Sequence, residues 1–332
     1  MSSDIESDPR AALCAAGLIG VNEQVELLPL TGGVSSDIMR VRTTTGRQFV
    51  IKQALAKLKV KAAWFANTDR NRVEQAYFAY TATLVPSMVP QLLHSGDTWF
   101  AMEYLDDGFM NWKTELLAGR ANLTSAKLAG AFLGQVHRAS WDNAAVRTEF
   151  ATDKNFHDLR IEPYLLTTGL RLPALQSLFE VEAKRLGGSK QALVHGDYSP
   201  KNMLVSTDRM FVLDAEVAWF GDPAFDLAFL LTHLHLKILV NVSNSAPTYA
   251  LIPTFWDRYC TTLGKAADAA LEGRTCRLIL MLMLARVHGK SPAEYLSTDQ
   301  QQTVTDFASA GLLDLPRRLS ALTTAWMTAL TK

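Results

Sequence analysis

Two apolar runs of the sequence are each followed closely by polar side chains that carry oxygen. The first run leads into His195 and Asp197, and Asn202 follows that aspartate five residues later. The second run begins at Phe211 and ends at Asp214. In phosphoryl transfer, one aspartate orients and deprotonates a hydroxyl, while an asparagine and a second aspartate hold the magnesium that neutralises the phosphates. The spacing therefore predicts two short strands that hold these three side chains at one edge.

Each of these residues has an assigned role and a structural alternative. Asp197 is the predicted general base, or at least the residue that orients the acceptor hydroxyl, and Asn202 and Asp214 are the predicted Mg²⁺ ligands, because hard oxygen ligands suit that ion. His195 is expected to brace the loop by hydrogen bonds. Glu216 would add a water-mediated metal contact if it continues the strand on the face of Asp214. The alternative is that these side chains only form turns and helix caps.

Lys52 closes a strand-like apolar run and is a candidate for the nucleotide phosphates. A surface lysine on an edge strand is the alternative. The phosphate role needs a carboxylate partner from the following helix. Glu74 is the preferred partner, and Glu103 is its rival, although a linker is expected around Glu103.

Two further segments predict nucleotide contacts. The turn at residues 31–36 lies between strands, where glycines let backbone amides approach phosphates and serines add donors; an ordinary hairpin is the alternative. The candidates there are Gly32, Gly33, Ser35 and Ser36. The strand at 98–104 ends where a junction is expected, so the Glu103 carbonyl and the Leu105 amide are assigned to adenine, with Met102 bordering it. A core strand without a ligand is the alternative.

The elements around these residues predict two parts. Strand-like runs at 25–30, 37–42 and 48–52 predict an antiparallel meander, followed by a helix at 69–83. Beyond about residue 105 the only predicted strands flank Asp197 and Asp214, and the rest is helical, at 124–139, 173–186, 223–240, 247–263, 266–287, 299–310 and 315–330. The predicted fold is α+β, with a small nucleotide-binding lobe at 1–104 and a larger helical lobe at 105–332 that holds the catalytic loop and acceptor pocket.

Two aspartates near the start of the predicted helix at 223–240 have structural interpretations. Asp222, before Pro223, is typical of an N-cap with proline at the first helical position. Asp226 falls in the first turn, where a carboxylate suits the helix dipole. It is also expected to hold the catalytic loop by hydrogen bonds.

Composition narrows the functional class. The 332 residues carry a formal net charge of +0, so no global field attracts nucleic acid or an anionic membrane. Three widely spaced cysteines fit a reducing compartment. The polar, acidic N-terminus lacks the features of a signal peptide, and the longest apolar runs are shorter than a membrane span. We therefore expect a cytoplasmic protein with no nucleic-acid or membrane partner.

Taken in order, these motifs resemble the aminoglycoside phosphotransferase and choline kinase family, small-molecule kinases with a two-lobe, protein-kinase-like fold. The resemblance spans roughly residues 20 to 240. It implies ATP in the cleft between the lobes, Mg²⁺ at Asn202 and Asp214, and Asp197 facing the acceptor hydroxyl. It also implies that Lys52 reaches the α- and β-phosphates and pairs with Glu74. The chain has His-Gly-Asp where protein kinases have His-Arg-Asp, so a protein substrate is not expected.

The acceptor stays open at this stage. The pattern around Asp214 and Glu216 is also similar to 5-methylthioribose kinases, whereas Asn202 is closer to the aminoglycoside and choline branches. Residues 231–332 carry ten basic and seven acidic side chains, which favours a neutral or anionic hydroxyl compound over an aminoglycoside. The expected function is ATP-dependent phosphorylation of a small alcohol such as a sugar or amino alcohol. The alternatives are an aminoglycoside kinase, an inactive nucleotide-binding scaffold, and an enzyme that transfers AMP.

Overall fold

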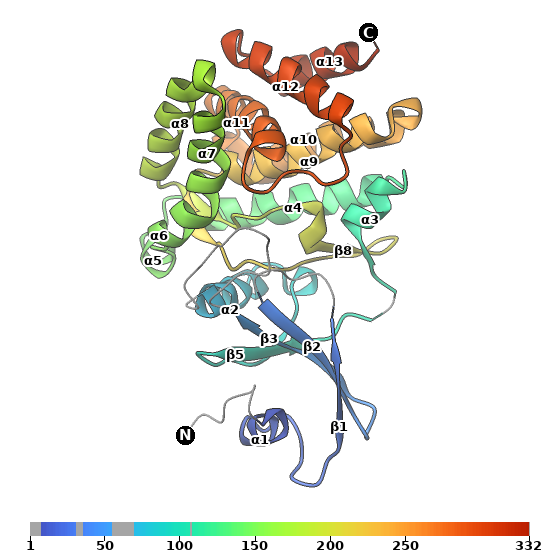
Figure 1. Cartoon of the computed structure of the whole chain (residues 1–332). Coiled ribbons are helices and arrows are strands. Elements are labelled where there is room, and N and C mark those ends of the chain that lie inside the picture. Colours follow the sequence, from blue (N-terminus) through green and yellow to red (C-terminus); the bar gives the residue numbers. More distant parts are fainter. Residues whose placement is uncertain (1–7, 31–35, 55–69, 107, 332) are drawn as a thin grey trace. The chain divides into compact units, whose positions relative to one another are not determined.

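The structure is a computed structural model that describes residues 8–30, 36–54, 70–106 and 108–331. It consists of two compact units, residues 1–108 and residues 109–332 (Figure 1). The functional roles that the sequence assigns to the two parts remain predictions.

The first unit is built on a five-stranded antiparallel sheet with the strand order β1-β2-β3-β5-β4. The predicted meander is confirmed, and the predicted helix at 69–83 is α2. The strand β4 was not predicted, because three residues are too few to show an alternating pattern. The elements are α1 (Pro9–Ala15), β1 (Val25–Pro29), β2 (Ser36–Thr43), β3 (Gln48–Ala54), α2 (Arg70–Ala82), the 3-10 turn η1 (Pro86–Met88), β4 (Leu92–His94) and β5 (Trp99–Glu103).

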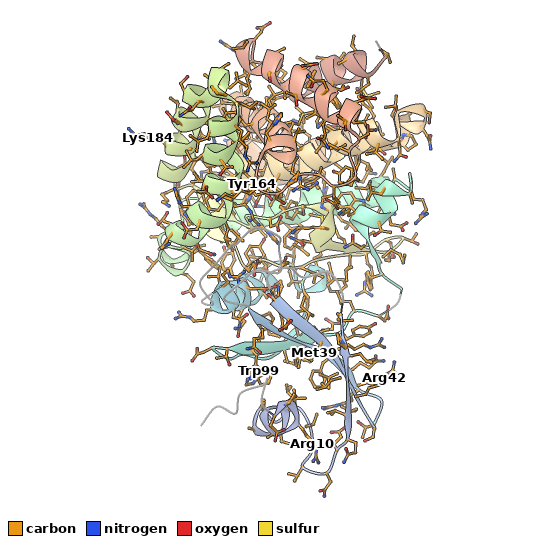
Figure 2. All side chains as sticks on the ribbon, viewed as in Figure 1. Arg10, Met39, Arg42, Trp99, Tyr164 and Lys184 are labelled. Atoms are coloured by element: carbon orange, nitrogen blue, oxygen red, sulfur yellow. The ribbon has the colours of Figure 1, made fainter. Side chains whose placement is uncertain are left out.

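One face of this sheet packs against α1. Val41, Phe49 and Ile51 point to this face and join Trp99 and the buried Leu13 of α1 in one apolar cluster. Figure 2 shows Trp99 and Met39 among the side chains of this region. Because side chains alternate along a strand, Val50 and Lys52 of β3 point to the opposite face.

The second unit is mainly helical. Its central helix is α9 (Ala224–Val240), which is buried along nearly its whole length and packs against α10, α11 and α13 (Figure 1). The other helices are α3 (Trp112–Leu117), α4 (Leu123–Ser140), α5 (Ala144–Glu149), α6 (Asp153–Phe156), the π-helical η2 (His157–Leu166), α7 (Thr167–Arg171), α8 (Gln176–Gly188), α10 (Ala246–Leu263), α11 (Ala269–His288), α12 (Thr298–Leu313) and α13 (Leu319–Leu330), with short 3-10 turns η3 (Pro173–Leu175), η4 (Pro200–Asn202), η5 (Val242–Asn244) and η6 (Gly264–Ala266). In the described ranges, no helix is both long enough and apolar enough to cross a membrane.

The short strands of the second unit differ in number and arrangement from those predicted from the sequence. In the part of this unit that the structure describes, five are present: β6 (Met110–Asn111), β7 (Ala192–Val194), β8 (Met203–Val205), β9 (Met210–Val212) and β10 (Trp219–Gly221). They form two sheets, β10-β7 and β6-β8-β9. The expectation that only two strands occur here was wrong, as was the expectation that the strands before Asp197 and Asp214 share one edge. Strands of two or three residues have no periodicity that could reveal their partners.

Candidate active site

A buried histidine joins the two segments that carry the predicted site. The His195 ring is fully buried, with Nδ1 3.2 Å from the Asp197 backbone nitrogen and Nε2 3.1 Å from the Leu213 carbonyl oxygen. The amide must donate to Nδ1, so the ring proton sits on Nε2 and is donated to Leu213. Burial lowers the pKa of His195 against the opposing charges of Asp226 and Asp197, which favours this neutral form. The predicted bracing role is confirmed.

Asp226, near the start of α9, holds the loop that contains His195 and Gly196. Its carboxylate accepts the backbone N–H groups of His195, at 2.7 Å, and Gly196, at 2.9 Å. Gly196 has a φ of +78°, and a Cβ there would lie 2.4 Å from the Val217 carbonyl oxygen. Only glycine fits this position, because the left-handed backbone and the close contact both exclude a side chain. The hydrogen bonds expected from Asp226 are confirmed.

Asp222 acts at the same helix end. Its Oδ1 accepts the backbone N–H of Ala224 at 3.0 Å, and α9 begins at that residue. This is the side-chain bond expected of a helix cap, although the helix starts one residue later than the predicted proline.

Asp197 lies between two cations. Its Oδ2 is 2.9 Å from Lys201 Nζ and 3.1 Å from an Arg160 terminal nitrogen. Burial alone would raise the pKa of Asp197, but the charges of Lys201 and Arg160 outweigh it and hold that pKa well below its usual range. Asp197 therefore stays ionised at neutral pH and is a weak base. Its geometry suits orienting a hydroxyl more than abstracting a proton early in the reaction.

Asn202 and Asp214 are tied to the same loop through the backbone. The Asn202 side-chain nitrogen donates to the Asp197 carbonyl oxygen at 3.0 Å, which leaves its Oδ1 as the acceptor end. The Leu213 amide donates to the Asn202 carbonyl oxygen at 2.9 Å, and the Leu213 carbonyl oxygen accepts from His195. Asp214 therefore follows a residue whose amide and carbonyl groups are both hydrogen-bonded to the loop. The Asp214 φ is +64°, an uncommon backbone region that aspartate tolerates and that clusters at functional sites.

Glu216 does not continue a strand. Strand β9 ends at Val212, and the left-handed turn at Asp214 breaks the alternation. The condition under which Glu216 would share a strand face with Asp214 is therefore not met. Its side chain is buried, and its carbonyl oxygen accepts the Asn155 side-chain amide at 2.9 Å.

In the first unit, Lys52 and Glu74 form a buried ion pair. The Lys52 Nζ lies 2.8 Å and 2.7 Å from the two Glu74 carboxylate oxygens, and the two side chains are 3% and 1% exposed. Strand β3 lies inside the sheet, so the alternative of an exposed edge-strand lysine is wrong. The rival partner, Glu103, has its carboxylate 3.3 Å from the Gln91 amide instead.

The remaining nucleotide candidates are placed as follows. Met102 is buried in β5, which pairs with β3 and β4. The Glu103 amide donates to the Gln91 carbonyl oxygen at 2.9 Å, and Leu105 follows the end of β5. Ser36 is buried at the first position of β2. The other turn candidates, Gly32, Gly33 and Ser35, lie outside the described residues, and the contacts assigned to all these residues remain predictions.

Sequence reasoning missed the two cations beside Asp197. Lys201 lies four residues after Asp197, inside the motif itself, so its spacing was a usable signal. Arg160 comes from the π-helical segment η2, 36 residues before Gly196, and its guanidinium also donates to the Gly196 carbonyl oxygen. Nothing in the local pattern marks Arg160, because only tertiary packing brings η2 to the loop.

Comparison with known proteins identifies the family of the chain. The model of the phosphotransferase enzyme family matches residues 26–273, and the chain belongs to that family. Methylthioribose kinase of Yersinia pseudotuberculosis is 26% identical over 229 residues, covering 60% of this chain and 56% of the relative. Methylthioribose kinase of Bacillus velezensis is 25% identical over 247 residues, covering 65% and 62%. The matches thus span little more than half the length of these relatives.

Solved structures share the fold at low identity. Amicoumacin kinase hAmiN, in complex with AMP-PNP and Ca²⁺, superposes with a TM-score of 0.58 at 12% identity, covering 96% of this chain and 98% of that one. A choline/ethanolamine kinase family protein from Mesorhizobium loti gives a TM-score of 0.53 at 17% identity, covering 98% and 100%. The predicted α+β, kinase-like fold is confirmed.

Proposed function

We propose that the protein is an ATP-dependent kinase that phosphorylates a hydroxyl group of a small molecule. The observation that carries the proposal is the buried, ionised Asp197 in a loop braced by His195 and Asp226 and flanked by two cations. The family membership and the names of the relatives support the same reaction class. The cytoplasm is the compartment that we propose, and the free cysteines Cys14, Cys260 and Cys276 are in keeping with it.

The reaction forms one bond and breaks one. The acceptor hydroxyl oxygen bonds to the γ-phosphorus of ATP, the bond to the bridging oxygen of ADP breaks, and the hydroxyl proton is released. Asp197 orients the hydroxyl through a hydrogen bond and receives or passes on its proton late in the step. Lys201 is placed to attract negative charge on the transferred group, and Arg160 keeps the carboxylate in position.

The donor set fits Mg²⁺ as the counterion of the triphosphate. Asn202 and Asp214 would hold it. The Asn202 side-chain nitrogen already donates to the Asp197 carbonyl oxygen, so the side-chain oxygen is the atom left for the ion. In the described part of the chain, no cluster of three histidine, cysteine or acidic residues is arranged for a metal ion. Two protein oxygens, completed by water and phosphate, are what Mg²⁺ uses in kinases. Its chemistry would be neutralisation of phosphate charge.

The Lys52–Glu74 pair supports nucleotide use in the first unit. A buried lysine held by a carboxylate presents a fixed positive charge, and we propose that it contacts the α- and β-phosphates. Gly32, Gly33, Ser35 and Ser36 would add donors to the phosphates, and Met102, Glu103 and Leu105 would border the adenine.

The test is a product assay with a panel of hydroxyl compounds that includes methylthioribose, sugars, amino alcohols and aminoglycosides. ADP and a phosphorylated acceptor are the expected products; pyrophosphate would indicate AMP transfer instead. Asp197→Ala should abolish turnover and still bind ATP, whereas Asp214→Ala should weaken binding of Mg·ATP. ATP binding without turnover across the whole panel would favour the inactive scaffold.

A further inference from the structure

One face of α9 leads from the catalytic aspartate to a second group of charges. Phe229, His233 and Lys237 are spaced by four residues and therefore lie on the same face of the helix. The Arg160 guanidinium, which contacts Asp197, lies 5.7 Å from the centroid of the Phe229 ring, and the His233 ring lies 5.5 Å beyond Phe229. Lys237 follows, about 12 Å from Phe229 along the helix axis.

Lys237 is buried, and within the described residues no carboxylate forms an ion pair with it. Its side chain is 0% exposed, and its Nζ lies 3.3 Å from the Tyr295 hydroxyl and 4.6 Å from the centroid of that ring. Burial, aided by the charges of Arg286 and Lys113, lowers the pKa of Lys237 to about 7, although the charge of Glu294 acts in the opposite direction. Among the described residues, Glu294 is the acidic group that acts on Lys237, and it is already paired with Lys113.

Arg286, on α11, adds a second buried cation. One of its terminal nitrogens binds the carbonyl oxygen and the hydroxyl of Ser291. Its Nε is buried and, within the described ranges, makes no hydrogen bond, although the residue is only 9% exposed. Buried cations are costly unless an anion compensates them. We call Lys113, His233, Lys237 and Arg286 the basic cluster.

The edge of the basic cluster reaches the protein surface. At its rim, the side chains of Lys113 and Glu294 are 32% and 65% exposed. Charges of the basic cluster and of the catalytic loop act on the same ring: Lys237, Arg286, Asp197 and Lys201 all influence His233. Burial is the main reason that the pKa of His233 is well below normal, so its ring stays neutral and offers one N–H donor.

We propose that the phosphate acceptor is an anionic hydroxyl compound whose carboxylate or phosphate group binds Lys237 and Arg286 while its hydroxyl faces Asp197. The inference rests on the proposed kinase function and specifies its substrate class. An anion would supply the missing counter-charge and the missing acceptor for Arg286 Nε. A cationic acceptor, such as an amino alcohol or aminoglycoside, would instead be repelled by the same groups. The hydroxyl and the anion are expected at opposite ends of the molecule.

The test uses acceptors that share a scaffold and differ in charge. Glucuronate, glucose 6-phosphate, glucose and glucosamine form one set, and ribose 5-phosphate and ribose form another. Dissociation constants come from calorimetry without nucleotide, and kcat/KM comes from ADP formation. At least one anionic member should bind ten-fold or more tightly than its neutral partner, and comparing carboxylate with phosphate identifies the anion.

Variants locate the site. Lys237→Met keeps the volume of the side chain, and Arg286→Met removes the other cation; each should reduce the anion preference about ten-fold or more. Lys184, which points outward from α8 in Figure 2, is the control, and Lys184→Met should leave the preference within two-fold. Circular dichroism establishes that each variant is folded.

The outcomes separate the two proposals. Phosphorylation of neutral or cationic members without any anion preference would overturn the anionic acceptor and leave the kinase standing. Anion-selective binding that requires Lys237, without any phosphorylated product, would support the site and count against the kinase. Equal binding of anionic and neutral partners, or a preference that survives both methionine variants, would overturn the inference whether or not ATP is consumed.

Discussion

Buried charges near the two ends of the α9 face differ in the partners that surround them. Near the helix start, Asp226 accepts two backbone amides, and Asp197 is paired with Arg160 and Lys201. Two turns beyond Phe229, Lys237 has a phenol as its hydrogen-bond partner and other cations as neighbours. A carboxylate whose partners come from the protein is positioned before any ligand arrives. Buried cations without enough opposite charge nearby destabilise the free protein, and binding of an anion would offset that destabilisation. From this difference we propose that the Asp197 end performs the chemistry and that the Lys237 end binds the substrate.

The comparison predicts opposite signs for removing charge at the two ends. Asp197→Asn leaves Arg160 facing Lys201 without a carboxylate, so the free energy of unfolding should fall by about 3 kcal/mol. Lys237→Met removes an uncompensated cation and should leave the free energy of unfolding unchanged or raise it. Urea unfolding at pH 7 measures both. If the two variants shift stability in the same direction, the contrast between the two ends is wrong.

A smaller loss of stability is expected from Asp226→Asn. The carboxamide has one oxygen for two backbone donors, so its amide group would face a backbone N–H and leave it without an acceptor. We expect a loss of about 2 kcal/mol, with a fall in kcat because the loop holding Asp197 loosens. Unfolding and steady-state assays check both effects. The exposed Asp257→Asn is the matched control, and an Asp226→Asn protein as stable and active as this control would contradict the assigned role.

Arg160→Met should lower kcat about ten-fold through Asp197. Removing the guanidinium takes away one of the charges that depress the Asp197 pKa, so that pKa should rise toward its usual range. Asp197 then becomes protonated at a higher pH, and the acidic limb of the kcat profile should move upward in pH. Profiles that extend to the lowest pH at which both proteins stay folded test this, because the acidic limb of the unchanged protein lies below the usual carboxyl range. An unshifted acidic limb would mean that Arg160 does not control the ionisation of Asp197.

The smallest effect concerns the pH dependence of stability at Lys237. Its folded pKa of about 7 lies below the value of roughly 10.4 for an unfolded chain. Between these values the unfolded chain binds more protons, so stability rises with pH, by about 1 kcal/mol per unit. Below pH 7 both states are protonated and the destabilising effect of the buried cation is fully present. Lys237→Met should lose this slope, whereas Lys184→Met should keep it. Equal slopes in urea unfolding at pH 7 and 9 would show that Lys237 is not the group responsible.

The sequence predicted the residues of the site more successfully than it predicted the strands that surround them. Asp197, Asn202, Asp214 and the Lys52–Glu74 pair could be proposed because each lies at a recognisable distance from an apolar run or a helix. The bracing role of His195 and the loop contacts of Asp226 followed the same logic. What failed was the sheet arrangement, since strands as short as β7 and β9 carry no periodic signal.

What the sequence determined by itself is the local order: the runs of the N-terminal meander that become strands, the places where polar groups follow apolar runs, and the contact of Asp226 with the loop. These are short-range properties, set by alternation, capping and backbone freedom. Only the tertiary structure decided that Arg160 reaches Asp197 and that Lys237 is buried near Arg286, where no carboxylate in the described part of the chain pairs with it. Those contacts join residues far apart in the chain, and whether a charge is compensated depends on packing that no local pattern records.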